Sequence, residues 1–167
     1  MKKIIFLWSL CFLILTETGC YSFKGISIPT DIHTYYVENF QNNAISAPAD
    51  INQRFSEALR SKIRNESRLI YNEQSPDLEF TGTISRFTLT PEAPQAGNTV
   101  ALNKLEIIIT VDLTNNKDES KNWKSKQFSY FRTFESDQDF ISIQDNLINE
   151  IFDQILENIF NDAFTGW

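Results

Sequence analysis

The stretch from Val100 to Phe134 constrains the fold of this chain most strongly, because its hydrophobic residues alternate with the period of a β-strand. Apolar side chains at every second position of Leu105–Leu113 predict one buried face, with mostly polar residues between them. Asn115–Asp118 predicts a turn, and Trp123–Phe134 predicts a returning strand. A long antiparallel hairpin is therefore expected at the centre of a sheet. Before it, Pro91–Asn98 predicts a surface loop.

Three earlier segments also carry strand or turn signals. Ile32–Phe40 has aromatic and β-branched residues on both faces, which predicts a first, interior strand. The polar run Gln41–Asn43 predicts a turn, and Arg68–Glu73 predicts a second strand. A third strand begins at Leu78, and its apolar residues change phase near Ser85–Arg86. One extra residue exchanges the faces of a strand, so a β-bulge is expected there.

Two segments show helical periodicity. Between Pro48 and Asn65 an apolar residue recurs every fourth position, which predicts one stripe facing a core. The second helix is expected from about Ile143 to Phe164, with Ser142 and Asp145 at the spacing of a capping box. Its apolar face is wide. That width fits either a helix wedged between the sheet and the first helix or one that also offers a strip to another protein.

Together these elements predict an α+β sandwich. The expected order is β-α-β-β-β-β-α, with a mixed or antiparallel sheet and two helices packed on one face. Residues 31–167 are expected to form this single domain, and residues 20–30 a short tether in front of it. Residues 31–167 contain no cysteine, so the fold must rest on core packing.

The first twenty residues have the layout of an export signal. Lys2 and Lys3 precede about a dozen apolar residues, and Gly19 stands directly before Cys20. Residues 1–19 are therefore expected to be a signal peptide, and the Cys20 thiol is expected to carry a diacylglyceryl anchor, as in a bacterial lipoprotein. The alternative is an ordinary signal peptide cut nearby, which would leave Cys20 as an unpaired thiol.

Charge and chemistry exclude several classes of function. The whole chain has a formal net charge of −7. Removing residues 1–19 takes away two lysines and one glutamate and changes that charge to −8, which disfavours nucleic acid as a partner. His33 is the only histidine, so no zinc site of the usual kind is expected, and no cofactor-binding motif occurs. Paired carboxylates at Asp118–Glu119 and Asp137–Asp139 are more typical of solvated turns than of a catalytic site.

Basic residues gather in the returning strand of the hairpin. Lys124, Lys126 and Arg132 share a parity, so they are expected on one face beside aromatic side chains. One interpretation is that they bind the phosphates of a glycolipid. The other is that they protect an edge strand from pairing with another chain.

Several stretches resemble the LptE family, the lipopolysaccharide-assembly lipoproteins, and its divergent branch in particular. The residues that carry the likeness are Phe40–Ala44, Phe55–Leu59, Phe80–Ile84 and Ala101–Leu105, together with Cys20 and the order of elements. The resemblance implies a mixed sheet with two helices on one face. It also implies a non-enzymatic lipoprotein of the outer membrane, which plugs the LptD β-barrel from the periplasmic side and assists insertion of lipopolysaccharide.

Two rival functions stay open from the sequence. The first is a periplasmic lipoprotein that binds another lipid or envelope component. The second is a small envelope hydrolase that uses the acidic pairs. The barrel interpretation expects an LptD-like partner, lipopolysaccharide and a membrane reached through the lipid on Cys20, whereas the first rival expects a lone domain with bound lipid.

Overall fold

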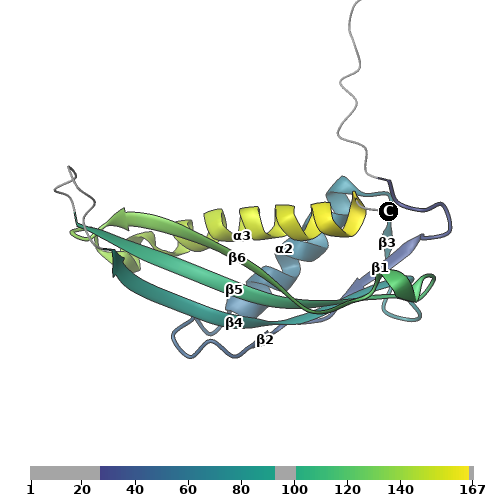
Figure 1. Ribbon diagram of the computed structural model, residues 1–167, viewed down its shortest axis with the longest axis horizontal. Helices are drawn as coiled ribbons and strands as arrows, with labels where there is room; N and C mark the ends of the chain where they lie inside the picture. The colour runs from purple at the N-terminus through teal and green to yellow at the C-terminus, as the bar shows by residue number, and fades with distance from the viewer. Residues whose placement is uncertain (1–26, 93–100, 166–167) are drawn as a thin grey trace, which may run out of the picture.

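Two helices cover one face of a mixed β-sheet in the computed structural model, which describes residues 27–92 and 101–165 (Figure 1). The α+β fold and its order of elements are confirmed. The elements are β1 (Thr34–Val37), β2 (Gln41–Asn42), α2 (Ile51–Glu66), β3 (Ile70–Tyr71), β4 (Leu78–Glu92), β5 (Leu102–Asn115), the 3-10 helix η1 (Glu119–Lys121), β6 (Trp123–Glu135) and α3 (Phe140–Phe164). The predicted signal peptide, Cys20 and most of the predicted loop 91–98 lie outside the described residues.

The sheet has the order β3-β1-β4-β5-β6, and β2 also pairs with β4. The long strands β4, β5 and β6 are antiparallel, whereas β1 runs parallel to both β3 and β4. The expected bulge is confirmed, because the β4–β5 register shifts between Ile84 and Arg86. The hairpin is not centred as predicted. Within the described chain β6 has a strand neighbour on one side only, so it is an edge strand, and the middle strand of the sheet is β4.

Three predictions of short segments need correction. Gln41–Asn42 forms β2 rather than a turn, because these backbones pair with Thr83 and Ile84 and the amide of Asn43 donates to the Ile84 carbonyl. The strand expected over Arg68–Glu73 shrinks to Ile70–Tyr71. The first strand is likewise shorter than expected, at Thr34–Val37, although it is an interior strand as predicted. The bounds of these short strands depend on which backbone groups pair, and the pattern of side chains in the sequence does not reveal that pairing.

The two helices bury their apolar stripes as predicted. Ile51, Phe55, Leu59 and Ile63 of α2 are fully buried. The wide face of α3 is also buried from Leu147 to Phe164 and packs on both β6 and α2, with the Phe55 and Phe152 rings 5.0 Å apart. The wedged-helix interpretation of this face is therefore correct.

The expected start of α3 was wrong. The helix begins at Phe140, and the Ser142 hydroxyl donates a hydrogen bond back to the Asp139 carbonyl from inside the first turn. The carboxylate of Asp145 instead pairs with Arg54 of α2 at 2.8 Å. The serine and the aspartate therefore do not form a capping box, because the chain turns into the helix three residues earlier.

Gly82 of β4 allows an unusually close approach of Phe40. A Cβ atom at this position would lie 2.5 Å from Cε1 of the Phe40 ring, and it would also meet the Thr110 carbonyl oxygen. The ring of Phe40 is fully buried and packs against Phe55 of α2, with the centroids 5.1 Å apart. The missing side chain at Gly82 thus lets an aromatic ring seal the core between the sheet and α2.

Asp77 joins three segments where β1, β4 and the β5–β6 connection meet. Its carboxylate accepts hydrogen bonds from the amides of His33 and Thr34, at 2.8 and 3.0 Å, and pairs with the Lys117 ammonium at 3.1 Å. Burial alone would raise the pKa of Asp77, but these donors together lower it to about 2. The ionised carboxylate is therefore a structural link, and His33 contributes through its backbone.

Candidate functional site

The three cations of β6 do not share one face. The β5–β6 register shifts between Val111, which pairs with Lys126, and Leu113, which pairs with Trp123. Two residues, Lys124 and Ser125, therefore lie opposite the single residue Asp112, as in a β-bulge. Ser125 takes a positive φ of 51°, and its amide donates to the Asp112 carboxylate at 2.6 Å.

This bulge reverses the side of the strand on which Lys124 lies. Trp123 and Lys126 are paired with buried residues of β5 and belong to the face beneath the helices. Lys124 is exposed and belongs to the opposite face. No ion pair is found for Lys124 within the described part of the chain. Strand alternation predicted that all three cations lie on one face of β6. The bulge at Ser125, the residue with the positive φ, puts Lys124 on the other face.

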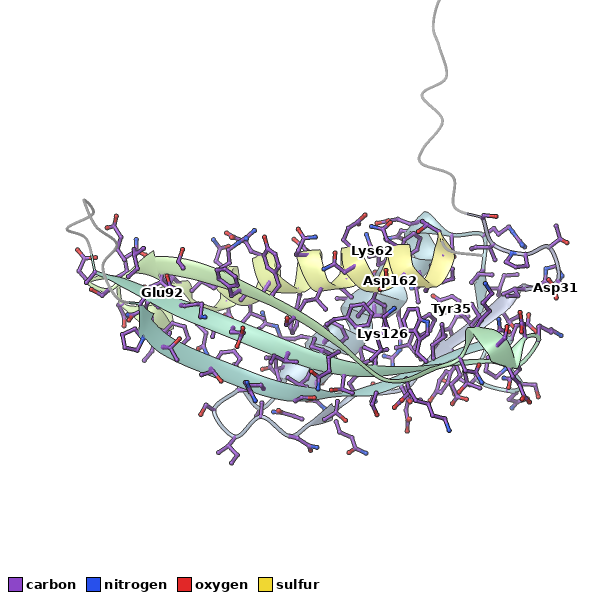
Figure 2. All side chains as sticks on the ribbon, viewed as in Figure 1. Asp31, Tyr35, Lys62, Glu92, Lys126 and Asp162 are labelled. Atoms are coloured by element: carbon purple, nitrogen blue, oxygen red, sulfur yellow. The ribbon has the colours of Figure 1, made fainter. Side chains whose placement is uncertain are left out.

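Lys126 is held between α3 and two aromatic rings. Its ammonium lies 2.9 Å from the Asp162 carboxylate and 4.4 and 5.5 Å from the ring centroids of Trp123 and Phe128. In Figure 2, Asp162 lies on α3 and Lys126 on the strand below it. The cation therefore has both a counterion and aromatic faces around it.

Arg132 makes the equivalent contact nearer the start of α3. Its Nε lies 2.7 Å from the Glu150 carboxylate, and its Nη1 donates to the Tyr130 hydroxyl at 2.7 Å. The bond to Glu150 raises the pKa of Arg132 above its already high value. Lys126 and Arg132 thus form two ion pairs that join β6 to α3, and both pairs are partly exposed to solvent.

Two open hollows flank these ion pairs. One of about 160 Å³ lies between the η1 turn and the end of α3 and is lined by Ser120, Asn122, Trp123 and Asp162 among others. The second, of about 410 Å³, lies at the other end of the β6–α3 seam. Its floor includes Phe134 and Leu147, and its rim includes Arg132, Glu135 and Glu150. The second hollow has more acidic than basic side chains, so an anion can bind Arg132 there only by displacing the Glu150 carboxylate.

The residues considered for catalysis are arranged as ordinary surface groups. The acidic pairs lie in exposed turns, and hydrogen bonds from Ser120 lower the pKa of Asp118, whereas a general acid needs a raised pKa. In residues 27–92 and 101–165, no group of three or more His, Cys, Asp or Glu side chains could hold a metal ion. No helix in those ranges has the length and hydrophobicity needed to cross a membrane.

A family model described as "LptE: Lipopolysaccharide-assembly" matches residues 32–163. The chain belongs to the LptE family. The match runs from the residues before β1 nearly to the end of α3, so it covers both layers of the fold. An LptE-family protein acts in lipopolysaccharide assembly rather than in catalysis, and none of the arrangements described above contradicts that role.

Solved structures share the fold of this LptE-family chain at low sequence identity. An uncharacterized lipoprotein B from Nitrosomonas europaea has a TM-score of 0.55 at 9% identity, over 81% of this chain and 88% of its own. A protein from Xanthomonas campestris has a TM-score of 0.53 at 10% identity, over 86% and 92% of the two chains. A putative neuraminyllactose-binding hemagglutinin homolog from Helicobacter pylori gives 0.51 at 12%, over 85% and 88%. No curated protein matches the chain.

Sequence reasoning missed the carboxylates that accompany the β6 cations. Glu150 and Asp162 lie on α3, far along the chain from their partners, and no spacing rule links a strand residue to a helix residue of another segment. The only available signal was their position on α3, each next to a buried isoleucine or alanine at the border of the apolar face. That position predicts a residue at the edge of a packed surface but does not identify its partner.

Proposed function

We propose that the protein is an outer-membrane lipoprotein, anchored through Cys20, that binds inside an LptD-like β-barrel and assists transport and insertion of lipopolysaccharide. The observation that carries the proposal is the LptE match over residues 32–163, since it spans nearly the whole described domain. The export signal and Cys20 support the lipid anchor. The proposed location is the cell outer membrane, with the domain on the periplasmic side and within the barrel lumen.

The architecture supports a role that depends on surfaces. Among the described residues, α2 and α3 close the core on one side of the sheet, and no α-helix covers the other side (Figure 1). The hollows on the described surface are open and small or polar, unlike the enclosed apolar pockets that hold whole lipid molecules. A plug needs a rigid body with a large contact surface, and a two-layer domain with a continuous core provides one.

Extraction in mild detergent followed by affinity purification tests the barrel proposal. A stoichiometric large outer-membrane barrel is the expected co-purifying protein. A lone domain with bound lipid would instead favour the alternative of a periplasmic lipoprotein that binds another lipid or envelope component. Mass spectrometry of the same sample tests the anchor, because a chain that begins at Cys20 and carries two or three acyl chains is expected. An unmodified Cys20 thiol contradicts it.

For contact with lipopolysaccharide we propose Lys124, Lys126 and Arg132. The bulge gives these residues unequal roles. Lys124 is exposed and ready to bind a phosphate, whereas Lys126 and Arg132 must exchange the carboxylates of α3 for the ligand. Charge-assisted bonds to phosphate are roughly twice as strong as neutral ones, so such an exchange is favourable where the ligand offers several phosphates.

A triple variant with these cations changed to glutamine tests this contact. Weaker binding of lipopolysaccharide with an unchanged fold is expected, and Lys124→Gln alone is expected to account for the largest part. The matched control replaces Arg86 and Lys104, cations of β4 and β5, with glutamine. The edge-protection alternative predicts unchanged affinity and increased self-association. Unchanged affinity in a monodisperse sample would contradict both interpretations.

A further inference from the structure

The edge strand β3 exposes apolar and aromatic side chains at the end of the molecule from which the N-terminal segment departs. Ile70 is 69% exposed and Tyr71 is 39% exposed. The amide of Ser27 donates to the Phe164 carbonyl at 3.0 Å, and Arg68 donates to the Pro29 carbonyl at 2.6 Å. These bonds fix Ser27 beside the end of α3 and Pro29 beside Arg68, two residues before the start of β3.

The side chain of Tyr71 is held in one orientation by its neighbours, so its ring has a fixed position on the surface. Its ring centroid lies 5.6 Å from that of Tyr35 and 5.9 Å from that of Tyr36, and its hydroxyl donates to Glu73. The ring thus has an apolar body packed on neighbours and a polar tip directed to a surface group. Tyrosine side chains with this division are enriched where protein meets the headgroup region of a membrane.

Two exposed arginines precede the strand along the chain. Arg64 lies in the last turn of α2, and Arg68 precedes β3 by two residues. An isoleucine, a tyrosine and two arginines together suit a lipid surface, since apolar groups enter the acyl boundary while guanidinium groups meet phosphates. We refer to Ile70, Tyr71, Arg64 and Arg68 as the β3 patch.

The opposite end of the molecule has a different character. α3 is 25 residues long and therefore spans about 37 Å. Its C-terminal end lies beside Ser27, and its start lies at the far end, near Glu92 (Figures 1 and 2). Around the start of α3 lie the carboxylates of Glu92, Glu135, Asp137 and Asp139, whereas that of Asp145 is paired with Arg54. A negatively charged lipid surface repels that end and attracts the β3 patch.

The tether is too short to leave the orientation open. Six residues lie between Cys20 and Ser27, and the seven Cα-to-Cα steps of a fully extended segment reach roughly 25 Å. The anchored end therefore stays near the headgroups, whereas the far end lies beyond the reach of the tether alone. We propose that the β3 patch contacts the phospholipid surface in which Cys20 is anchored, and so sets the orientation of the domain. This inference rests on the proposed lipidation of Cys20 and concerns the anchored domain outside the barrel.

Site-specific fluorescence on the lipidated, full mature chain tests the inference. The lipid consumes the Cys20 sulfur, so Ile70→Cys introduces the single free thiol for a bimane label. The matched control is Ile141→Cys, an isoleucine that is 80% exposed at the far start of α3. Both proteins are placed in vesicles of phosphatidylethanolamine and phosphatidylglycerol that contain a headgroup-attached quencher. Circular dichroism checks that both variants fold.

We expect loss of most bimane emission at position 70 and emission near the unquenched level at position 141. Arg64→Glu in the Ile70→Cys background should restore much of the emission, because it replaces attraction to phosphate with repulsion. Equal quenching at both positions, quenching at 141 alone, or no quenching in an anchored protein would overturn the inference. The inference would also be overturned if the bimane label at position 70 were shielded only when a second copy of the chain or a barrel was present.

The mass of each sample separates this result from the anchor proposal. If Cys20 carries no lipid, the label attaches at two thiols and the protein leaves the vesicles, and the anchor proposal fails together with the inference. If Cys20 is lipidated and the quenching pattern is wrong, only the orientation fails.

Discussion

Replacing Asp77 with asparagine should destabilise the domain at neutral pH and leave its stability almost unchanged in strong acid. The folded state holds the pKa of Asp77 at about 2, against 3.8 for an ordinary aspartate, through donors on His33, Thr34 and Lys117. One pKa unit corresponds to about 1.4 kcal/mol, so ionised Asp77 contributes up to about 2 kcal/mol. The side chain is only 13% exposed, so solvent screens these contacts little.

The pH dependence of that contribution has a definite sign. The folded-state pKa lies below the unfolded one, so the unfolded chain binds more protons between about pH 4 and about pH 2, and the contribution is lost as the pH falls through that window. Urea unfolding of wild type and Asp77→Asn at a series of pH values measures the difference directly. Asp137→Asn, which removes the same charge from an exposed turn, is the control. A wild-type advantage that stays constant down to about pH 2 would refute the reasoning.

Three other changes test the core and the seam. Ile109→Asp should lower the free energy of unfolding by more than about 4 kcal/mol, because the side chain of Ile109 is fully buried. Ile108→Asp, on the opposite face of the strand, should lower it far less, and urea titration of the two variants compares them. Gly82→Ala should cost about 1–3 kcal/mol through overpacking, and a melting temperature equal to that of wild type would show that the ring above it moves freely. Glu150→Gln with Asp162→Asn should cost less than about 1 kcal/mol per ion pair yet strengthen lipopolysaccharide binding; weaker binding would contradict the exchange mechanism.

The fold was largely predictable because its main elements bury one face each. In β5 every second residue from Leu105 to Leu113 is buried, and in α2 every fourth residue from Ile51 to Ile63 is buried, so pattern and burial agree. The short strands were not predictable in the same way. Gln41–Asn42 is polar and pairs because Thr83–Ile84 offers open backbone groups beside it, which is a property of the assembled sheet.

The sequence identified the cations proposed as a site but did not give their arrangement. The sequence identified Lys124, Lys126 and Arg132, and strand alternation put them on one face. The register shift beside Ser125 depends on a single backbone dihedral angle and a bond to Asp112. Serine carries no strong signal for a positive φ, unlike glycine or asparagine, so the sequence did not indicate the bulge.

The arrangement at β6 limits how this domain can recognise an anionic glycolipid. Lys126 and Arg132 stand at the two ends of the β6–α3 seam, and each is neutralised by a carboxylate from α3. Exposed ion pairs of this kind stabilise a fold only weakly, so they hold α3 weakly. Lys124, on the other face, meets no such competition among the described residues. A ligand that binds Lys124 first therefore keeps its phosphates on the bare side of the sheet, and only a second ligand, or a long one that passes around the β6 edge, reaches the seam.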